Sequence, residues 1–363
     1  MPTESSLPQT TETGHPARWW HAEGDRVVCD LCPRYCRVGD GQAGFCFIRV
    51  NRKGRLYSLG YGRPAALQID PIEKKPLNHF MPGSRILSLG TAGCNMGCKF
   101  CQNWEISKSR EDQTRSVDLS PEEVVAGAIR RGCPSLAFTY NEPTIWAEYA
   151  IDISLKAREC GLKCVMVTNG YVTLEALPEV YEHIDAANVD LKAFTEEFYR
   201  KVTLTRMRPV LDVLAELRKR GVWIEVTNLI IPSLNDALAE TRELSRWVMD
   251  HLGEETPLHF TAFHPDFKLM DLPGTPQETV EAAREEALGI GLKHVYTGNV
   301  HSRDGGTTYC PSCGNAVIRR SWHSVEEYRL VGGRCSCGRV IAGYFPEPPE
   351  RAGARGLISS LLR

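Results

Sequence analysis

Residues 81–300 alternate between short apolar runs and longer amphipathic runs with helical spacing. The strand-like runs fall at residues 85–90, 135–140, 164–168, 186–191, 222–230, 257–263 and 294–297. The helix-like runs begin at residue 121 and recur at 145–160, 173–183, 209–220, 237–252 and 277–290. This alternation predicts βαβ units and a parallel sheet. Spacing alone leaves a partial (β/α) barrel and a doubly wound sheet open, and both place ligands at the carboxyl ends of the strands.

The overall composition is that of an ordinary globular protein. The 363 residues carry a formal net charge of -2, with 42% hydrophobic and 24% charged residues. Such a balance does not indicate a nucleic-acid-binding domain, and we find no apolar run of about 18 residues that would span a membrane. Residues 1–18 lack the charged start and apolar core of a signal peptide. We therefore expect a cytoplasmic protein with disordered tails at residues 1–18 and 347–363.

Most of the fourteen cysteines fall in three tight groups. Disulfide frameworks are typical of small secreted domains that lack a sufficient core, whereas tight grouping is typical of metal sites. The groups divide the chain into an N-terminal Cys-rich metal-binding segment at 19–80, a central α/β unit at 81–300 and a C-terminal module at 301–346.

The central group lies directly after the first predicted strand. Cys94, Cys98 and Cys101 are spaced C-x3-C-x2-C, and the aromatic Phe100 precedes the last of them. A structural zinc site usually has four protein ligands. Three thiolates on a [4Fe–4S] cluster leave one iron free for a substrate or cofactor. Spacing, aromatic residue and position together resemble the radical S-adenosylmethionine (SAM) signature, in which SAM binds the open iron and is cleaved reductively.

Polar residues follow the later predicted strands, where a ligand would lie. The candidates for contacts to SAM are Asn141, Glu142, Thr168, Asn169, Asp190, Lys192 and His264. Each also has a simpler explanation: a helix cap, an Asn-Gly turn, a solvent-facing pair or a structural histidine. Lys74 and Lys75 precede the cluster loop, and they fit either an anion-binding role or a solvated linker.

Together these motifs resemble the pyruvate formate-lyase activating enzyme group of radical SAM proteins. The stretch from Gln68 to Ser109, the CDLCPRYC motif and the TYNEPT run are more narrowly similar to the radical SAM member of the AmmeMemoRadiSam system. The resemblance implies a partial (β/α)6 barrel with SAM as cofactor. One departure is Val167, where activators of glycyl radical enzymes often carry an Asp in a monovalent cation site. The resemblance therefore does not extend to that cation site or to the close functional analogy that depends on it.

Two further cysteine groups flank the barrel. The first comprises Cys29, Cys32, Cys36 and Cys46, which could hold either structural zinc or an auxiliary iron–sulfur cluster. The second comprises Cys310, Cys313, Cys335 and Cys337, whose two knuckles resemble a zinc ribbon or a rubredoxin-like module. Its second knuckle is C-x-C rather than C-x2-C, so zinc and iron both stay open for this group.

These features predict an enzyme that cleaves SAM to a 5′-deoxyadenosyl radical, which then abstracts hydrogen from a protein or small-molecule substrate. Activation of a glycyl radical enzyme is one form of this chemistry, and the ribbon favours a protein target. The expected partners are SAM and an electron donor such as flavodoxin or ferredoxin, with neither nucleic acid nor membrane. The alternative is a non-catalytic iron–sulfur or zinc scaffold or an electron-transfer protein, but a carrier needs no SAM pocket.

Overall fold

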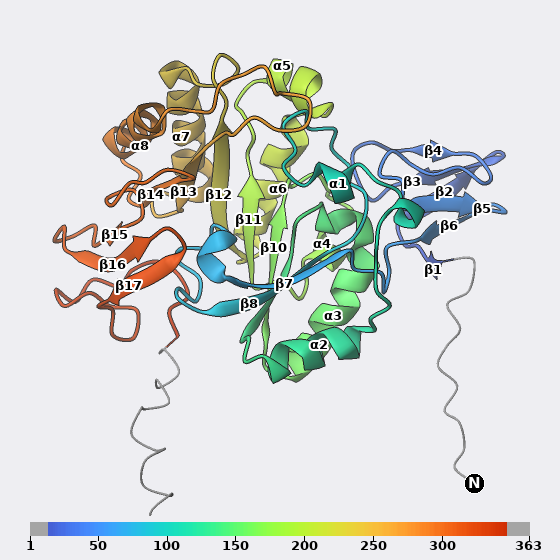
Figure 1. The fold of residues 1–363 in the computed structure, drawn as a ribbon, viewed down its shortest axis with the longest axis horizontal. Coiled ribbons are helices and arrows are strands. Elements are labelled where there is room, and N and C mark those ends of the chain that lie inside the picture. The colour runs from blue at the N-terminus through green and yellow to red at the C-terminus, as the bar shows by residue number, and fades with distance from the viewer. Residues whose placement is uncertain (1–13, 347–363) are drawn as a thin grey trace, which may run out of the picture.

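The computed structural model describes residues 14–346. An eight-stranded sheet with the order β14-β13-β12-β11-β10-β9-β8-β7 forms its centre (Figure 1). Its strands are β7 (Ala66–Pro71), β8 (Arg85–Gly90), β9 (Ser135–Phe138), β10 (Lys163–Thr168), β11 (Ala186–Asp190), β12 (Trp223–Ile230), β13 (Leu258–Ala262) and β14 (Val295–Gly298). All neighbours pair in parallel except β7, which pairs antiparallel with β8. The sheet is the predicted partial barrel, open between β7 and β14.

Helices connect successive parallel strands, as the (β/α)6 pattern requires. The α-helices are α1 (Trp104–Ser107), α2 (Pro121–Arg130), α3 (Ala147–Glu159), α4 (Leu177–Val180), α5 (Glu196–Phe198), α6 (Arg208–Lys219), α7 (Leu238–Leu252) and α8 (Gln277–Ile290). Shorter turns are η1 (Ile72–Lys74), η2 (Glu111–Gln113), η3 (Pro143–Trp146) and the π-helical η4 (Tyr199–Thr203). Ser120 and Glu123 form a reciprocal capping box that starts α2.

The helix predicted at residues 173–183 is only the four-residue α4. The Thr173 hydroxyl accepts from Ala176 N (3.3 Å) and donates to Asp30 O (2.8 Å). A side chain that bonds nearby backbone competes with helix formation. The segment before α4 therefore anchors the N-terminal cysteine loop to the barrel.

The barrel interior combines small and polar side chains with an apolar cluster that includes Ile86 and Val165, while the exterior is apolar. On β8 and β9, Leu87, Leu89, Leu136 and Phe138 belong to the main hydrophobic core. The alternating positions carry Ser88 and Ala137, which are paired in register. Small interior residues leave room inside a barrel of this size, and this room becomes the cavity described below.

Two small sheets precede the barrel and one follows it, on opposite sides in Figure 1. The first two contain β1 (His15–Pro16), β2 (Trp20–Glu23), β3 (Arg26–Cys29), β4 (Arg37–Val38), β5 (Arg49–Arg52) and β6 (Arg55–Ser58). The last contains β15 (Thr308–Tyr309), β16 (Ala316–Ser321) and β17 (Ser324–Tyr328).

The structure differs from the predicted segment limits in two places. β7 lies before residue 81 but belongs to the barrel sheet. His15 and Pro16 pair with β6, although a tail was expected there. The rest of the two predicted tails, residues 1–13 and 347–363, lies outside the described residues. No helix in the described part of the chain is long and apolar enough to cross a membrane.

Candidate active site

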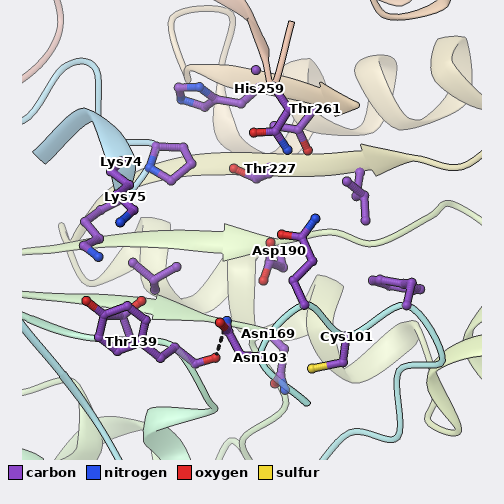
Figure 2. A pocket seen from close by; sticks show the side chains of 18 of the residues that line it. Lys74, Lys75, Cys101, Asn103, Thr139, Asn169, Asp190, Thr227, His259 and Thr261 are labelled. Carbon is purple, nitrogen blue, oxygen red and sulfur yellow. Dashed lines mark hydrogen bonds between the residues drawn. The ribbon is translucent and has the colours of Figure 1, made fainter. Parts of the chain in front are cut away.

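A cavity of about 780 Å³ occupies the barrel interior. It is lined by the cluster loop after β8, by interior residues of the strands and by residues of the C-terminal module. In Figure 2, Asp190, Thr227 and His259 come from the neighbouring strands β11, β12 and β13, and Cys101 comes from the cluster loop. A cofactor bound by these cysteines would therefore face the barrel interior.

The cluster loop places Cys94, Cys98 and Cys101 on the wall of this cavity. Gly97 N donates to Thr203 O (2.8 Å), which fastens the loop to η4. Met96 N lies 3.5 Å from Cys94 Sγ and donates to it. Such N–H donors stabilise thiolates.

Cys94 lies in a buried position near the positive charge of Lys108. Burial raises the pKa of Cys94 to about 12, despite the nearby positive charge of Lys108. A buried thiolate needs a compensating positive charge, and iron ions would supply it. The three residues therefore fit a [4Fe–4S] cluster with one iron left open.

Asn141 connects the β9 loop to the cluster loop. Its Nδ2 donates to Gly93 O (2.8 Å), Ala92 O and Thr91 Oγ1 (both 3.2 Å). Its Oδ1 accepts from Thr91 N (3.1 Å). The side chain lines the cavity, but these bonds hold the backbone immediately before Cys94.

Glu142 joins the ends of β9 and β10. Its carboxylate accepts from Thr168 Oγ1 (2.7 Å) and Asn169 N (2.7 Å), as well as from the amide and hydroxyl of Thr144. Burial raises the pKa of Glu142, although these hydrogen bonds oppose the shift. Glu142 and Asn169 line the cavity, whereas Thr168 reaches it only through Glu142.

Asp190 and Lys192 form an ion pair at the end of β11, with Nζ 2.7 Å from Oδ2. Burial alone lowers the pKa of Lys192, but Asp190 and Cys98 outweigh it and raise that pKa. Both side chains line the cavity. The cluster-binding wall therefore carries a cation next to Cys98.

Comparison with known proteins agrees with this geometry. The family model described as Radical SAM superfamily matches residues 88–245. The "Uncharacterized protein MJ0808" of Methanocaldococcus jannaschii is 47% identical over 88% of this chain and 96% of its own length. The chain belongs to the radical SAM superfamily. It is accordingly an enzyme of the radical SAM class.

More distant similarities to this radical SAM protein were found among both sequences and solved structures. The pyruvate formate-lyase-activating enzyme of Clostridium pasteurianum is 24% identical over 51% of this chain and 83% of its own length. The crystal structure of a radical SAM methyltransferase from Sphaerobacter thermophilus matches with a TM-score of 0.49 and 16% identity. That match covers 61% of this chain and 68% of the other.

His264 lies apart from the other predicted SAM contacts. It is exposed, its Nδ1 lies 3.0 Å from Pro265 O, and it does not line the cavity. β13 ends at Ala262 and Pro265 follows closely, so the chain turns outward at this point. Any contact of His264 with SAM stays a prediction.

The radical SAM cavity also has residues that the motifs did not indicate. Interior positions of β12 and β13 contribute Thr227, His259 and Thr261. Thr227 and His259 are paired in register. Alternation with buried apolar neighbours is the only sequence signal that could have identified them.

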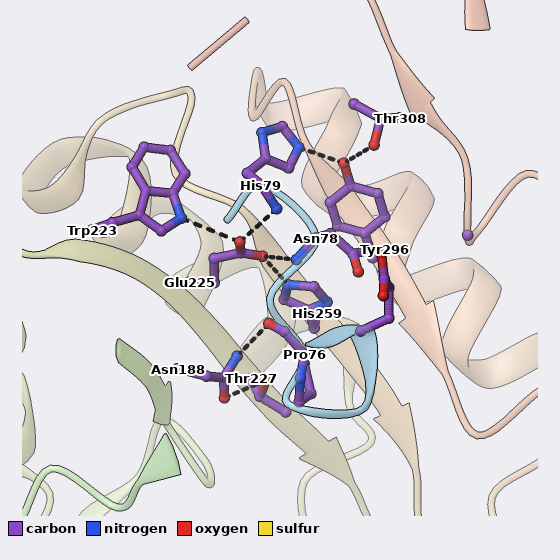
Figure 3. A network of polar contacts seen from close by, with 12 residues as sticks. Pro76, Asn78, His79, Asn188, Trp223, Glu225, Thr227, His259, Tyr296 and Thr308 are labelled. Atoms are coloured by element: carbon purple, nitrogen blue, oxygen red, sulfur yellow. Dashed lines mark hydrogen bonds and ion pairs between the residues drawn. The ribbon is translucent and has the colours of Figure 1, made fainter. Parts of the chain in front are cut away.

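A buried carboxylate lies behind the cavity wall, bonded to the lining residues Asn78 and His259. Glu225 accepts from His79 N (2.7 Å), Asn78 N (2.9 Å) and Trp223 Nε1 (3.2 Å), and it pairs with His259 Nε2 (2.7 Å; Figure 3). His79 Nε2 continues the network to Tyr296 OH (2.6 Å). This network joins the barrel strands to the loop after η1.

The C-terminal module closes the cavity beside this network. Arg320 of β16 donates to Asn78 O (2.7 Å) and Thr308 Oγ1 (2.9 Å), and it lies 3.5 Å from Glu73. Arg320, Trp322 and His323 all line the cavity. The module is thus part of the wall of the radical SAM cavity.

The two flanking cysteine groups differ in geometry. All four C-terminal thiols lie within 4.8 Å of one another, with Sγ–Sγ distances of 3.6 Å for Cys310–Cys337 and 3.7 Å for Cys313–Cys335. Among the described residues, no three thiols of either other group lie that close together.

Proposed function

We propose that this enzyme cleaves SAM reductively and directs the resulting hydrogen abstraction to a substrate held in the barrel. The observation that supports this most is that Cys94, Cys98, Cys101 and the Asp190–Lys192 pair line one cavity of about 780 Å³. The three cysteines would hold a [4Fe–4S] cluster whose open iron binds SAM. When bound, the [4Fe–4S] cluster and SAM supply the 5′-deoxyadenosyl radical. The protein orients the cluster and SAM and excludes competing reactions.

The protein's contribution follows from charge and position. Lys192 is a partly buried cation that interacts electrostatically with Cys98, so it would offset the negative charge of the cluster and attract the SAM carboxylate. Asn169 and Glu142 line the same cavity and offer an amide and a carboxylate to the amino acid portion of SAM. Asn141 would act as a positioning residue through the cluster loop.

The substrate would occupy the deeper part of the cavity. Hydroxyl groups of Thr227 and Thr261 and the ring of His259 line this part. Lys74 and Lys75 reach the same space, although both are paired with Asp70. This lining favours a polar substrate or a polar side chain of a protein substrate.

We extend the proposal to the cellular setting. The Gln68–Ser109 similarity supports the AmmeMemoRadiSam type. We further propose a cytoplasmic location and a flavodoxin or ferredoxin as electron donor. The C-terminal group would bind one metal ion, because thiolates around a tetrahedral ion at about 2.3 Å lie roughly 3.8 Å apart, and we propose structural zinc as that ion. Metal analysis should find about one zinc per chain, and a Cys310→Ser variant should lose it.

The deciding test is 5′-deoxyadenosine formation by anaerobically reconstituted protein with SAM and a strong reductant. Wild type should form it and Cys94→Ala should not. Cys133→Ala is the matched control, because Cys133 is buried but lies outside the three groups. Cleavage by Cys94→Ala at the wild-type rate would overturn the proposal. Cluster-loaded wild type that forms none, even with substrate candidates, would favour a scaffold.

A further inference from the structure

We propose that Cys29, Cys32, Cys36 and Cys46 bind a second iron–sulfur cluster, which passes electrons to the central one. The metal site stands on its own geometry, and its role as an electron relay rests on the proposed function. The group therefore would not be a zinc site.

The four thiols converge, but they do not form a zinc-sized cage. Cys29, Cys32 and Cys46 are buried and Cys36 is partly exposed. Cys32 interacts electrostatically with all three of the others. Yet no three of them lie within 4.8 Å of one another, in contrast to the C-terminal group of the same described chain. Thiolates on a cluster bind different irons, so they lie farther apart than those on one zinc.

The central cysteines allow the thiol distances of the N-terminal group to be compared with those of a cluster-binding triad in the same chain. Cys94, Cys98 and Cys101 also lie outside the 4.8 Å limit. They are the triad of a superfamily that holds a [4Fe–4S] cluster. The N-terminal group thus resembles the cluster-binding triad, and differs from the ribbon, in having no three thiols within 4.8 Å of one another among the described residues.

The surroundings offer donors to sulfur. Phe45 N donates to Cys36 Sγ at 3.5 Å. Arg49 is fully buried and paired with Glu148, while its Nε is buried without a hydrogen-bond partner among the described residues. The positive charge of Arg49 acts on both Cys29 and Cys46. Cluster sulfurs carry negative charge, and hydrogen bonds to them tune the reduction potential.

The two cysteine loops are in direct contact. The carbonyl oxygen of Cys46 lies 2.1 Å from the position that a β-carbon on Gly93 would occupy, and Gly93 adjoins Cys94. Arg34 donates from the first loop to Asn95 O in the second. A short path therefore joins the two metal sites through packed backbone.

This contact suits transfer of one electron at a time. The N-terminal cluster would be oxidised from 1+ to 2+ as the central cluster is reduced from 2+ to 1+. A low-potential flavodoxin or ferredoxin would then reduce the N-terminal cluster again. Cys36 is the partly exposed ligand, and its neighbours Tyr35 and Phe45 are exposed, so this face is where the donor would approach.

The site itself is tested by metal content in the full chain. A Cys94→Ala/Cys98→Ala/Cys101→Ala variant, purified anaerobically from iron-supplemented cells, should retain about four irons with matching sulfide. Its only zinc should be that of the C-terminal group. Iron-free protein with a second zinc per chain would overturn the proposal. Neither result depends on SAM cleavage.

Reduced wild type provides a second measurement if the triple variant does not fold. Electron paramagnetic resonance should show two [4Fe–4S] signals, and SAM should alter only one. A single signal that SAM alters completely would overturn the proposal.

The relay is tested with two reductants. Cys32→Ala should lower the ratio of flavodoxin-driven to titanium(III)-driven 5′-deoxyadenosine formation, because titanium(III) reaches the central site directly. Cys160→Ala, which changes an exposed cysteine outside the three groups, is the control and should keep the wild-type ratio. An unchanged ratio in Cys32→Ala would overturn the relay. Absence of product from wild type with both reductants would instead count against the proposed function.

Discussion

His259, which lines the cavity, has its Nε2 2.7 Å from Oε2 of Glu225 behind the cavity wall. A carboxylate only accepts hydrogen bonds, so this contact places a proton on Nε2 of the imidazole. Glu225 is fully buried and His259 is nearly so. The pair thus fixes the ring of a residue that faces the substrate space.

Glu225→Gln should destabilise the fold. The carboxylate accepts from His79 N, Trp223 Nε1 and His259 as well as from Asn78 N. The amide group of Gln would point a donor at one of these donors, at a cost of about 3 kcal/mol in the free energy of unfolding. Chemical unfolding measures this cost.

Glu216→Gln, which breaks ion pairs on the surface of α6, is the control for that experiment. It should change the free energy of unfolding by less than about 1 kcal/mol. Equal effects of the two substitutions would contradict the role assigned to Glu225.

Asn141→Ala should weaken retention of the central cluster without removing a ligand. The side chain holds the backbone of Thr91, Ala92 and Gly93, and its loss leaves buried polar groups unpaired at about 1–3 kcal/mol each. Iron content after anaerobic gel filtration and the rate of cluster loss in air measure the effect. Asn103→Ala, which removes one bond to Tyr140 O on the exposed rim, should retain more iron. Equal retention of iron by both variants would argue against a role of Asn141 in holding the cluster loop.

Acid should weaken the fold through His294. Burial lowers its pKa from 6.5 to about 4, and the nearby charges of Arg339 and Lys293 act in the same direction. The unfolded chain therefore binds a proton more readily between pH 6.5 and pH 4, so the free energy of unfolding falls as pH is lowered through this window. The ring of His79 lies 4.3 Å away and is also kept neutral by burial, which lowers its pKa.

The measurement is the unfolding free energy of wild type and His294→Gln at intervals from pH 7 to pH 4. The variant should show a shallower decline, because one of the two buried imidazoles no longer titrates. Parallel curves would mean that His294 does not contribute to acid sensitivity.

The parallel strands could be predicted well from the sequence, because each is a short apolar run between two amphipathic segments with helical spacing. The observed β8 and β12 begin within one residue of their predicted positions. β7 was not predicted, because its burial alternates weakly and its antiparallel pairing with β8 depends on tertiary contacts. Local patterns identify strands better than they identify sheet membership.

The residues of the candidate site also differ in whether local sequence patterns could predict them. Asp190 and Lys192 were predictable as a pair because two residues at alternate strand positions share one face. Glu225 and His259 were not, because they are distant in sequence and meet only when β12 and β13 pair. His264 looked like a strand-end ligand, yet its exposure depends on how the chain leaves β13.

Gly93→Ala should lower the free energy of unfolding far more than an ordinary glycine substitution. Gly93 combines a positive φ with a close approach to the backbone of Cys46. Gly93 has φ +83°, and an added β-carbon would lie 2.1 Å from Cys46 O, a backbone atom that cannot rotate away. Gly132 has φ +64° but no atom within 4 Å of its added β-carbon, so Gly132→Ala isolates the backbone strain. We expect Gly132→Ala to cost about 1–2 kcal/mol and Gly93→Ala to cost at least about 1–3 kcal/mol more. Unfolding and iron analysis of both variants test this, since similar results would mean that the two cysteine loops need no close contact.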